Sequence, residues 1–185
     1  MKSGIVILSE LTGAVRERVL DIQRRFDPRL AEGLPPHLTI TGSSGAGPMS
    51  SSTSVEELRR ALEPVARATA QMTLVFERPR RFMQSNVVVL PLDPHGPLRE
   101  LHDRIASSGL LFERPRFTFT PHVTLNLFRE LRQQELEALL AERVVEPVTI
   151  SSIAAHRTVD IVKTERLIEL ELTGTPRDRS IKPAR

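Results

Sequence analysis

The chain has 185 residues, of which 39% are hydrophobic and 26% charged, with a formal net charge of +3 and no cysteine. This ordinary globular composition predicts one compact unit, and the lack of cysteine excludes disulfides, thiolate catalysis and cysteine-ligated metal sites. Since no apolar run reaches the roughly 18 residues of a membrane span and the N-terminus lacks a signal-peptide pattern, we expect a cytoplasmic protein without a membrane partner.

The first half of the chain alternates short apolar runs with amphipathic stretches. We expect a strand over 4–9, a helix over 11–26 ended by Asp27-Pro28, and then a strand over 37–41, a helix over 54–69 and a strand over 72–78. Ser54 suits the N-cap of the second helix, because Glu57 three residues later completes a capping box. The Gly- and Ser-rich stretch 42–53 predicts a mobile loop.

The second half repeats this order. We expect a strand over 86–92, a helix over 97–108 stopped by Gly109, and then a strand over 118–128, a helix over 132–143 and strands over 148–158 and 166–173. A His-x-Thr segment begins 33 positions after residue 4 in one half and 36 positions after residue 86 in the other. Such matching predicts a duplicated unit with approximate two-fold symmetry, in which the two motif strands face one another across a cleft. We expect one domain over 1–174 and a disordered basic tail over 175–185.

The two matched segments are His37-Leu38-Thr39-Ile40 and His122-Val123-Thr124-Leu125. Because side chains alternate along a strand, each segment places its imidazole and hydroxyl on one face and its aliphatic residues on the other. Two such pairs suit phosphoryl transfer: one imidazole takes a proton from the attacking oxygen while the other gives one to the leaving oxygen. The threonine hydroxyls can donate to the nonbridging phosphate oxygens.

A wider set of residues now resembles a known family. The paired motifs, the stretch Phe117-Thr118-Phe119-Thr120-Pro121-His122 and the strand Ile153-Ala154-Ala155-His156-Arg157 are similar to the 2H phosphoesterase superfamily, particularly its 2'-5' RNA ligase and RNA 2',3'-cyclic phosphodiesterase branch. The resemblance covers residues 4–173. It implies an α+β fold, a bilobal duplicated unit of two antiparallel sheets with outer helices and a central cleft. It also implies that His37 and His122 form the acid-base pair and that Thr39 and Thr124 bind phosphate.

Several further residues are candidates for contacts with substrate. Thr41 and Asn126 continue the polar faces of the motif strands, and His156 and Arg157 lie on a strand that borders the cleft in the resembled family. For the last two, strand packing and surface charge are the alternative.

The remaining histidines and an arginine cluster have simpler interpretations. His95 in a turn predicts a solvated side chain, and His102 predicts a surface or partly packed residue on a helix. The arginines at positions 78, 80 and 81 beside Phe82 predict a solvated turn, with phosphate pairing and base stacking as the alternative.

The substrate stays open at this stage, because the segments after both motifs, Thr41-Gly42-Ser43 and Asn126-Leu127-Phe128-Arg129, differ from those of many relatives. We expect a monomeric enzyme without metal or cofactor that opens the 2',3'-cyclic phosphate of RNA ends or nucleotides to a 2'-phosphate, with 2'-5' RNA ligation as the reverse reaction. The alternatives are hydrolysis of small cyclic phosphates or 2'-5' oligonucleotides, and a non-catalytic RNA-binding module. A sequence pI near 10.1 agrees with a phosphorylated partner, although genome base composition explains the arginine content equally well.

Overall fold

The computed structural model describes residues 4–42, 44–158 and 163–176. Its helices are α1 (Gly13–Phe26), α2 (Pro28–Gly33), α3 (Val55–Arg67), α4 (Gly96–Ala106) and α5 (Gln133–Ala141). Its strands are β1 (Gly4–Glu10), β2 (His37–Thr41), β3 (Met49–Ser50), β4 (Met72–Leu74), β5 (Arg80–Arg81), β6 (Val88–Pro91), β7 (His122–Asn126), β8 (Val148–Ile150), β9 (Ser152–Thr158) and β10 (Thr164–Glu171).

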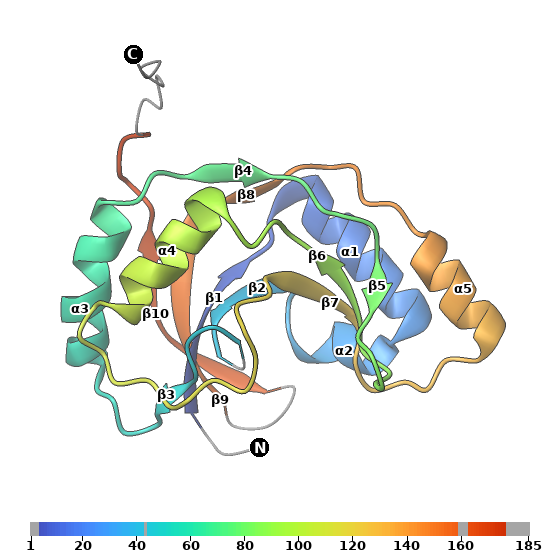
Figure 1. Cartoon of the computed structure of the whole chain (residues 1–185), viewed down its shortest axis with the longest axis horizontal. Coiled ribbons are helices and arrows are strands. Elements are labelled where there is room, and N and C mark those ends of the chain that lie inside the picture. Colours follow the sequence, from blue (N-terminus) through green and yellow to red (C-terminus); the bar gives the residue numbers. More distant parts are fainter. Residues whose placement is uncertain (1–3, 43, 159–162, 177–185) are drawn as a thin grey trace, which may run out of the picture.

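The strands of the described residues form two antiparallel sheets. The larger has the order β10-β9-β1-β2-β7-β6-β5, with β3 paired to β1, and the smaller pairs β4 with β8. In Figure 1, α3 and α4 lie at one end of the large sheet and α1, α2 and α5 at the other. The predicted α+β class with two antiparallel sheets and outer helices is confirmed.

The expected duplication is visible in the pairing of equivalent strands. Each half runs strand, helix, motif strand, helix and strand, and the equivalent pairs β2 with β7 and β4 with β8 are hydrogen-bonded to each other. We expected the two motif strands to face one another across a cleft, and this expectation was wrong. They are neighbours in one continuous sheet: β2 pairs with β1 on one side and with β7 on the other, and β7 in turn pairs with β6.

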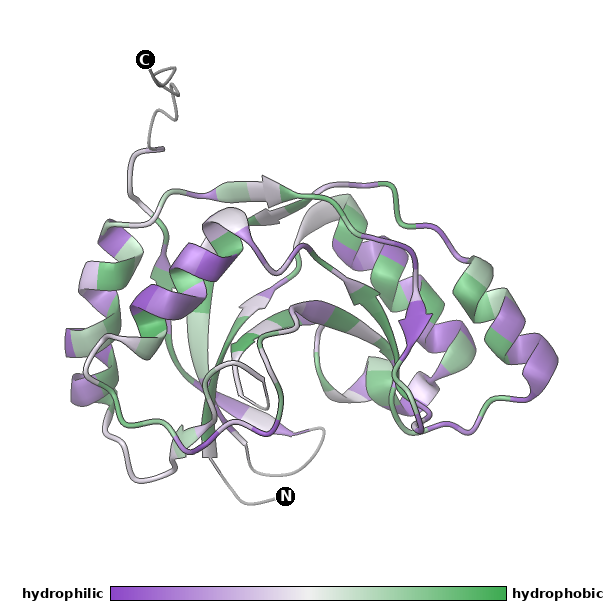
Figure 2. Ribbon diagram, viewed as in Figure 1, coloured by the Kyte–Doolittle hydropathy of each residue, from purple (hydrophilic) through white to green (hydrophobic). Residues whose placement is uncertain are grey.

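The apolar residues of the central strands and helices form one core. Leu38 and Val123 are 0% and 1% exposed, and burying such a side chain contributes about 1.5 to 3 kcal/mol. The helices are amphipathic and turn their hydrophobic stripes inward, whereas the central strands are largely hydrophobic (Figure 2). In α1, Val15, Val19 and Ile22 are spaced for one helix face and all three are buried.

Local sequence signals explain most element ends. Ser54 accepts a hydrogen bond from the Glu57 amide and donates its own amide to the Glu57 carboxylate, so the predicted capping box is confirmed. Asp27 ends α1 as expected, but it also caps α2, a short helix that we did not predict, with Pro28 at its first position.

The stretch 42–53, expected to be a mobile loop, is instead packed against the protein in its described residues. Ala46 and Met49 are buried, and Met49 belongs to β3 on the edge of β1. The Gly45 amide donates to the Phe117 carbonyl at 2.9 Å, and the Pro48 carbonyl accepts from the Glu113 amide at 2.9 Å. These bonds hold the segment against the stretch that precedes β7. The Gly and Ser content had suggested mobility, but tertiary contacts overrode it.

Most other boundaries shift by a few residues. The strand expected over 118–128 is shorter, and the one expected over 72–78 stops at Leu74. Of the expected tail 175–185, residues 177–185 lie outside the described part of the chain. Within the described residues, no helix is long and apolar enough to cross a membrane.

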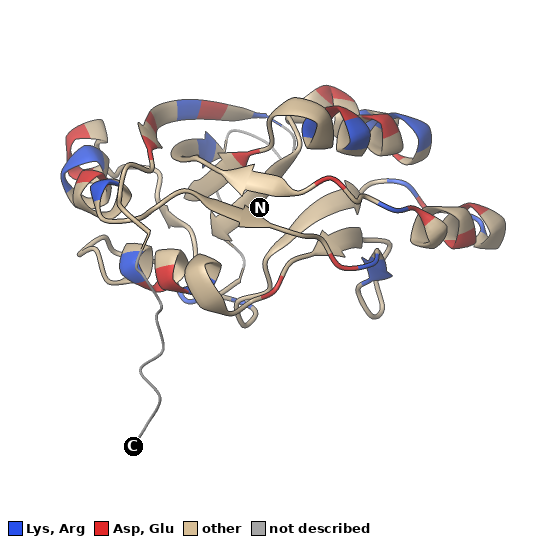
Figure 3. Ribbon diagram, turned by 90° about the horizontal axis from the view of Figure 1, so that it is seen from above, with Lys and Arg blue, Asp and Glu red and all other residues tan. Residues whose placement is uncertain are grey.

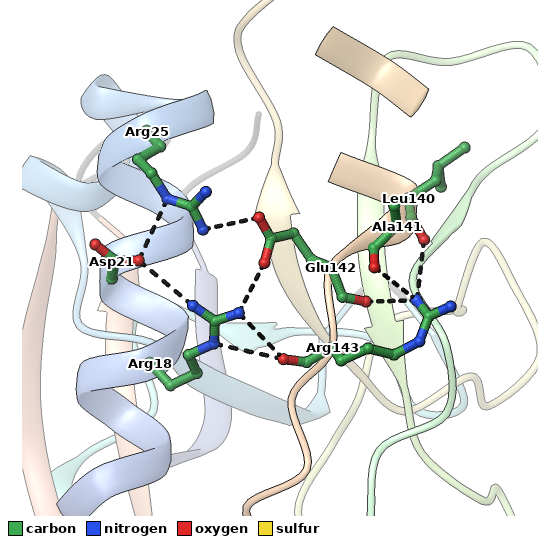
Figure 4. Close-up of polar contacts among 7 residues, drawn as sticks. All are labelled: Arg18, Asp21, Arg25, Leu140, Ala141, Glu142 and Arg143. Carbon is green, nitrogen blue, oxygen red and sulfur yellow. Dashed lines mark hydrogen bonds and ion pairs between the residues drawn. The ribbon is translucent and has the colours of Figure 1, made fainter. Parts of the chain in front are cut away.

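Charged side chains gather on the helices and on the edge strand β5, while the central strands carry few (Figure 3). One charged cluster joins the two helices at one end of the molecule. Glu142, just after α5, pairs with both Arg18 and Arg25 of α1 at 2.8 Å, and Arg18 also donates to the carbonyl of Arg143 (Figure 4). The cluster thus anchors α5 to the helix that packs on β7.

Candidate active site

The two motif strands present the same pattern. In each, the His and Thr are partly exposed and the intervening residue is buried, so both polar pairs lie on one face of the sheet. Leu38 pairs with Val123 in antiparallel register, which places His37 opposite Thr124 and Thr39 opposite His122. We call this side of the sheet the motif face. His37 and His122 are therefore diagonal neighbours on this face, and residues so placed lie about 7 to 8 Å apart.

Both motif histidines are held in the same way. His37 Nδ1 lies 2.8 Å from the Pro35 carbonyl, and His122 Nδ1 lies 2.6 Å from the Thr120 carbonyl. A carbonyl oxygen only accepts, so Nδ1 must carry the hydrogen in each ring. The neutral imidazole therefore presents an unprotonated Nε2, and the cation presents an Nε2–H donor. Either ring can serve as base or acid through the same atom.

The surroundings shift both histidines in the same direction. Burial lowers the pKa of His37, partly offset by the bond to the Pro35 carbonyl and by the carboxylate of Glu10. Burial also lowers the pKa of His122, the bond to Thr120 opposes this, and the nearby His37 lowers it further. The two rings thus interact electrostatically, and the carboxylate near His37 favours protonation of that ring over the other.

Phe82 is a site residue that we had not favoured. Its ring meets His122 edge-on, with centroids 5.1 Å apart and planes at 90°.

Arg80 and Arg81 form the edge strand β5 rather than the solvated turn we expected. Register places Arg80 beside Val89 and Val89 beside Thr124, so Arg80 shares the motif face. Arg80 pairs with Glu77, and Arg81 donates to the carbonyl of Ser85.

Glu10 and His156 flank His37 on the other side. Glu10 is paired across strands with His37, and Glu10 Oε1 lies 3.6 Å from His156 Nε2. That distance is too long for a hydrogen bond. Burial lowers the pKa of His156 to about 4, so the ring is neutral near pH 7 and the two groups form no ion pair there. No pattern in the sequence pointed to Glu10.

His156 and Arg157, the two candidate substrate contacts on β9, lie in different surroundings. His156 is buried, with Nδ1 hydrogen-bonded to the Thr164 hydroxyl at 2.9 Å. Arg157, the next residue along β9, alternates away from it and pairs with Glu165. Only His156 of the two lies beside the motif residues.

Thr41 and Asn126 are placed inside the protein, so their expected contact with substrate is not supported. Both are 0% exposed. Thr41 Oγ1 accepts from the Ile7 amide across a β-bulge, and Asn126 Nδ2 donates to the carbonyls of Asn86 and Arg129. Irregular pairing at the ends of the motif strands leaves backbone groups that these side chains satisfy.

The other two histidines, His95 and His102, differ in exposure. His95 is exposed, as expected. His102 is not a surface residue: it is 5% exposed, bonds Asp103 through Nδ1 and packs on Phe119 with centroids 4.2 Å apart. Across the described residues, no group of three or more His, Asp or Glu side chains is arranged to hold a metal ion.

A family model described as the 2'-5' RNA ligase superfamily matches residues 11–160. The chain belongs to this superfamily, whose members are 2H phosphoesterases. The match includes both motif strands and ends just beyond β9, so both His-x-Thr pairs lie within it. The resemblance that the two His-x-Thr segments carried is confirmed.

Relatives of known sequence or structure agree with this membership. A protein of Oceanobacillus iheyensis, provisionally named a phosphoesterase, is 27% identical over 147 residues, which cover 79% of this chain and 81% of the relative. A solved protein of Thermus thermophilus matches with a TM-score of 0.60 at 16% identity, over 92% of this chain and 98% of the other. LigT of E. coli in complex with 3'-AMP matches with a TM-score of 0.56 at 18% identity, over 94% and 99%. At these identities the structures show a shared fold, and the superfamily supports an enzyme of the phosphoesterase type.

Proposed function

We propose that this protein hydrolyses the 2',3'-cyclic phosphate of RNA ends or nucleotides to a 2'-phosphate, using only its own side chains. The observation that carries the proposal is the matched pair of His and Thr side chains on one sheet face, each imidazole held through Nδ1 so that Nε2 is free. Superfamily membership supports it. LigT, which shares the fold, is known in complex with 3'-AMP and with phosphate, which agrees with a nucleotide phosphate as ligand.

In the proposed step, neutral His122 takes a proton from water through Nε2 as the water oxygen bonds to phosphorus. The bond from phosphorus to the 3'-oxygen breaks, and protonated His37 gives its Nε2 proton to that oxygen. The product carries a 2'-phosphate and a 3'-hydroxyl, and solvent exchange resets the two rings. Thr39 and Thr124 donate hydrogen bonds to the nonbridging oxygens, where charge accumulates.

Because the two motifs offer the same groups, only their surroundings can indicate which histidine is the acid and which is the base. Burial lowers the pKa of both rings, but the carboxylate of Glu10 opposes this shift at His37, whereas the nearby His37 adds to it at His122. These effects favour a protonated His37 and a neutral His122, which supports His37 as acid and His122 as base.

The test uses the purified protein and an oligoribonucleotide that ends in a 2',3'-cyclic phosphate, with the product identified by its phosphate position. We expect His37→Ala and His122→Ala each to lower turnover at least about 100-fold while leaving the folded structure intact. His95→Ala is the matched control, because His95 is exposed and belongs to neither motif strand. Wild-type turnover in both motif variants would refute the proposal. RNA binding without any turnover by the wild type would favour a binding module instead.

A second experiment separates the two roles. A substrate whose 3'-side oxygen leaves as an already acidic group needs no proton from the acid. We therefore expect His37→Ala to regain much of its turnover on such an activated ester and His122→Ala to regain little. Rescue of His122→Ala alone would reverse the assignment.

A further inference from the structure

A basic feature that includes none of the motif residues plays no part in the proposed chemistry. It is a groove of about 480 Å³ between α4, the loop after β2 and the extended stretch that precedes β7. We call it the arginine groove. The lining residues that matter here are Arg99, His102, Arg114, Arg116, Phe117 and Phe119.

The charge of the groove comes from three arginines that differ in their pairing. Arg99 is held by Asp103 through Nε at 2.8 Å. Arg114 and Arg116 are exposed, and neither has an ion-pair or hydrogen-bond partner among the described residues. Guanidinium groups that no carboxylate pairs are suited to bind an anion such as a phosphate.

The backbone that carries these arginines is fixed on both sides. Phe112 pairs with Met49, and the Phe117 carbonyl accepts from the Gly45 amide. A methyl group added to Gly45 would lie 2.2 Å from His102 Nε2, which shows how closely the loop packs on α4. Arg114 and Arg116 therefore project from a positioned segment.

The groove also offers an aromatic surface. Phe117 is 66% exposed, an unusual state for a large apolar ring, and it follows directly after Arg116. Phe119, two residues on, is buried against His102 and forms part of the groove wall. Proteins that bind single-stranded nucleic acids combine an exposed aromatic ring with a basic groove in this way. A base stacks on the ring while the arginines bind the phosphates.

The groove is connected to the motif face through the chain itself. Phe117 lies five residues before His122. At about 3.3 Å per extended residue, the groove begins within roughly 17 Å of the catalytic imidazole. A strand whose end lies between the two motif histidines can thus extend to the groove within a few nucleotides.

We propose that the arginine groove binds the phosphodiester backbone of single-stranded RNA at a distance from the reacting phosphate, with Arg114 and Arg116 on the phosphates and Phe117 stacked on a base. The enzyme then prefers oligonucleotide ends to mononucleotides. This inference rests on the proposed function for the identity of the reacting end, but binding to the groove needs no turnover.

The test compares the double variant Arg114→Gln/Arg116→Gln with a control of equal charge loss, Arg24→Gln/Arg59→Gln, whose arginines are exposed on α1 and α3 outside the groove. Binding of a labelled ten-nucleotide RNA is followed by fluorescence anisotropy over a range of salt concentrations. We expect the groove variant to lose at least about 10-fold in affinity and its salt slope to fall by about 1.4, from two lost phosphate contacts on a single strand. The control should change much less. Phe117→Leu, which keeps an apolar side chain but not the flat ring, should lose about 10-fold.

The second readout is kcat/KM on a cyclic-phosphate oligonucleotide and on a nucleoside 2',3'-cyclic phosphate. We expect the groove variant to lose activity on the oligonucleotide through KM and to keep wild-type values on the mononucleotide. Equal losses in the groove and control variants, or an unchanged affinity and salt slope in the groove variant, would overturn the proposal. If the wild type hydrolyses neither substrate, the proposed function fails, and the anisotropy measurement still decides whether the groove binds RNA.

Discussion

The carboxylate of Asp27 is the contact whose loss we expect to matter most for the motif strand β7. Asp27 is 1% exposed. Its Oδ1 caps α2 by accepting from the Leu30 amide at 3.1 Å, and its Oδ2 accepts from the amides of Leu127 and Phe128 at 2.8 Å each. The second pair of bonds fixes the chain at the point where it leaves β7.

Replacement of Asp27 by Asn separates the two functions. The amide oxygen of Asn can still cap α2, since Asn is as good an N-cap as Asp. Its NH₂ group would instead face the Leu127 and Phe128 amides, so two buried donors lose their acceptor. Hydrogen bonds to a charged group contribute about 1.5 to 3 kcal/mol each, and relief of the buried charge offsets part of the loss. We expect a net cost of about 3 kcal/mol.

Equilibrium unfolding in urea measures this cost. With a slope of about 1 to 3 kcal/mol per molar, the midpoint of Asp27→Asn should fall by about 1 to 3 M. The control is Asp93→Asn, because Asp93 is exposed and accepts only the His95 amide in the described contacts. A midpoint for Asp27→Asn within about 0.3 M of the wild type would refute the reasoning, because the two short bonds would then contribute almost nothing.

Three further predictions concern pH, metal dependence and the charged cluster. Since burial lowers the pKa of both His37 and His122, and one ring must be protonated, we expect a bell-shaped rate profile with its maximum below the ordinary histidine value of 6.5, not centred on neutrality; a maximum above pH 7 would contradict this. Turnover should survive EDTA, and a complete loss that a divalent ion restores would rule out the proposed chemistry. Glu142→Gln should cost about 1 kcal/mol of unfolding free energy at low salt and less at high salt, because the carboxylate pairs with Arg18 and Arg25 near the surface; equal loss at all salt concentrations would point to packing instead.

Local chemistry in the sequence was sufficient for most of the elements and for the shared face of each His-x-Thr pair. The alternation of His-x-Thr with aliphatic residues predicted which side chains share a face, and both motif strands show that pattern. The capping box at Ser54 predicted a helix start, since its two hydrogen bonds depend on residues only three positions apart. The repeated order of elements predicted the duplication for the same reason: periodicity is a property of the chain itself.

Contacts between distant segments were beyond local reasoning. Whether the two motif strands face each other or pair edge to edge depends on which edges are left open, and only the assembled sheet shows that β2 and β7 are neighbours. Thr41 and Asn126 look available for substrate in an alternating strand, but bulges at the strand ends turn them inward to satisfy backbone groups.

The same limit explains Glu10 and Phe82. Neither stands at a fixed spacing from a motif histidine, and both reach the site because separate strands lie side by side. The sequence by itself therefore determined which polar groups the two motif strands present on one face. The tertiary structure decided what surrounds those groups, because burial, charge and packing at the site come from residues far apart in the chain.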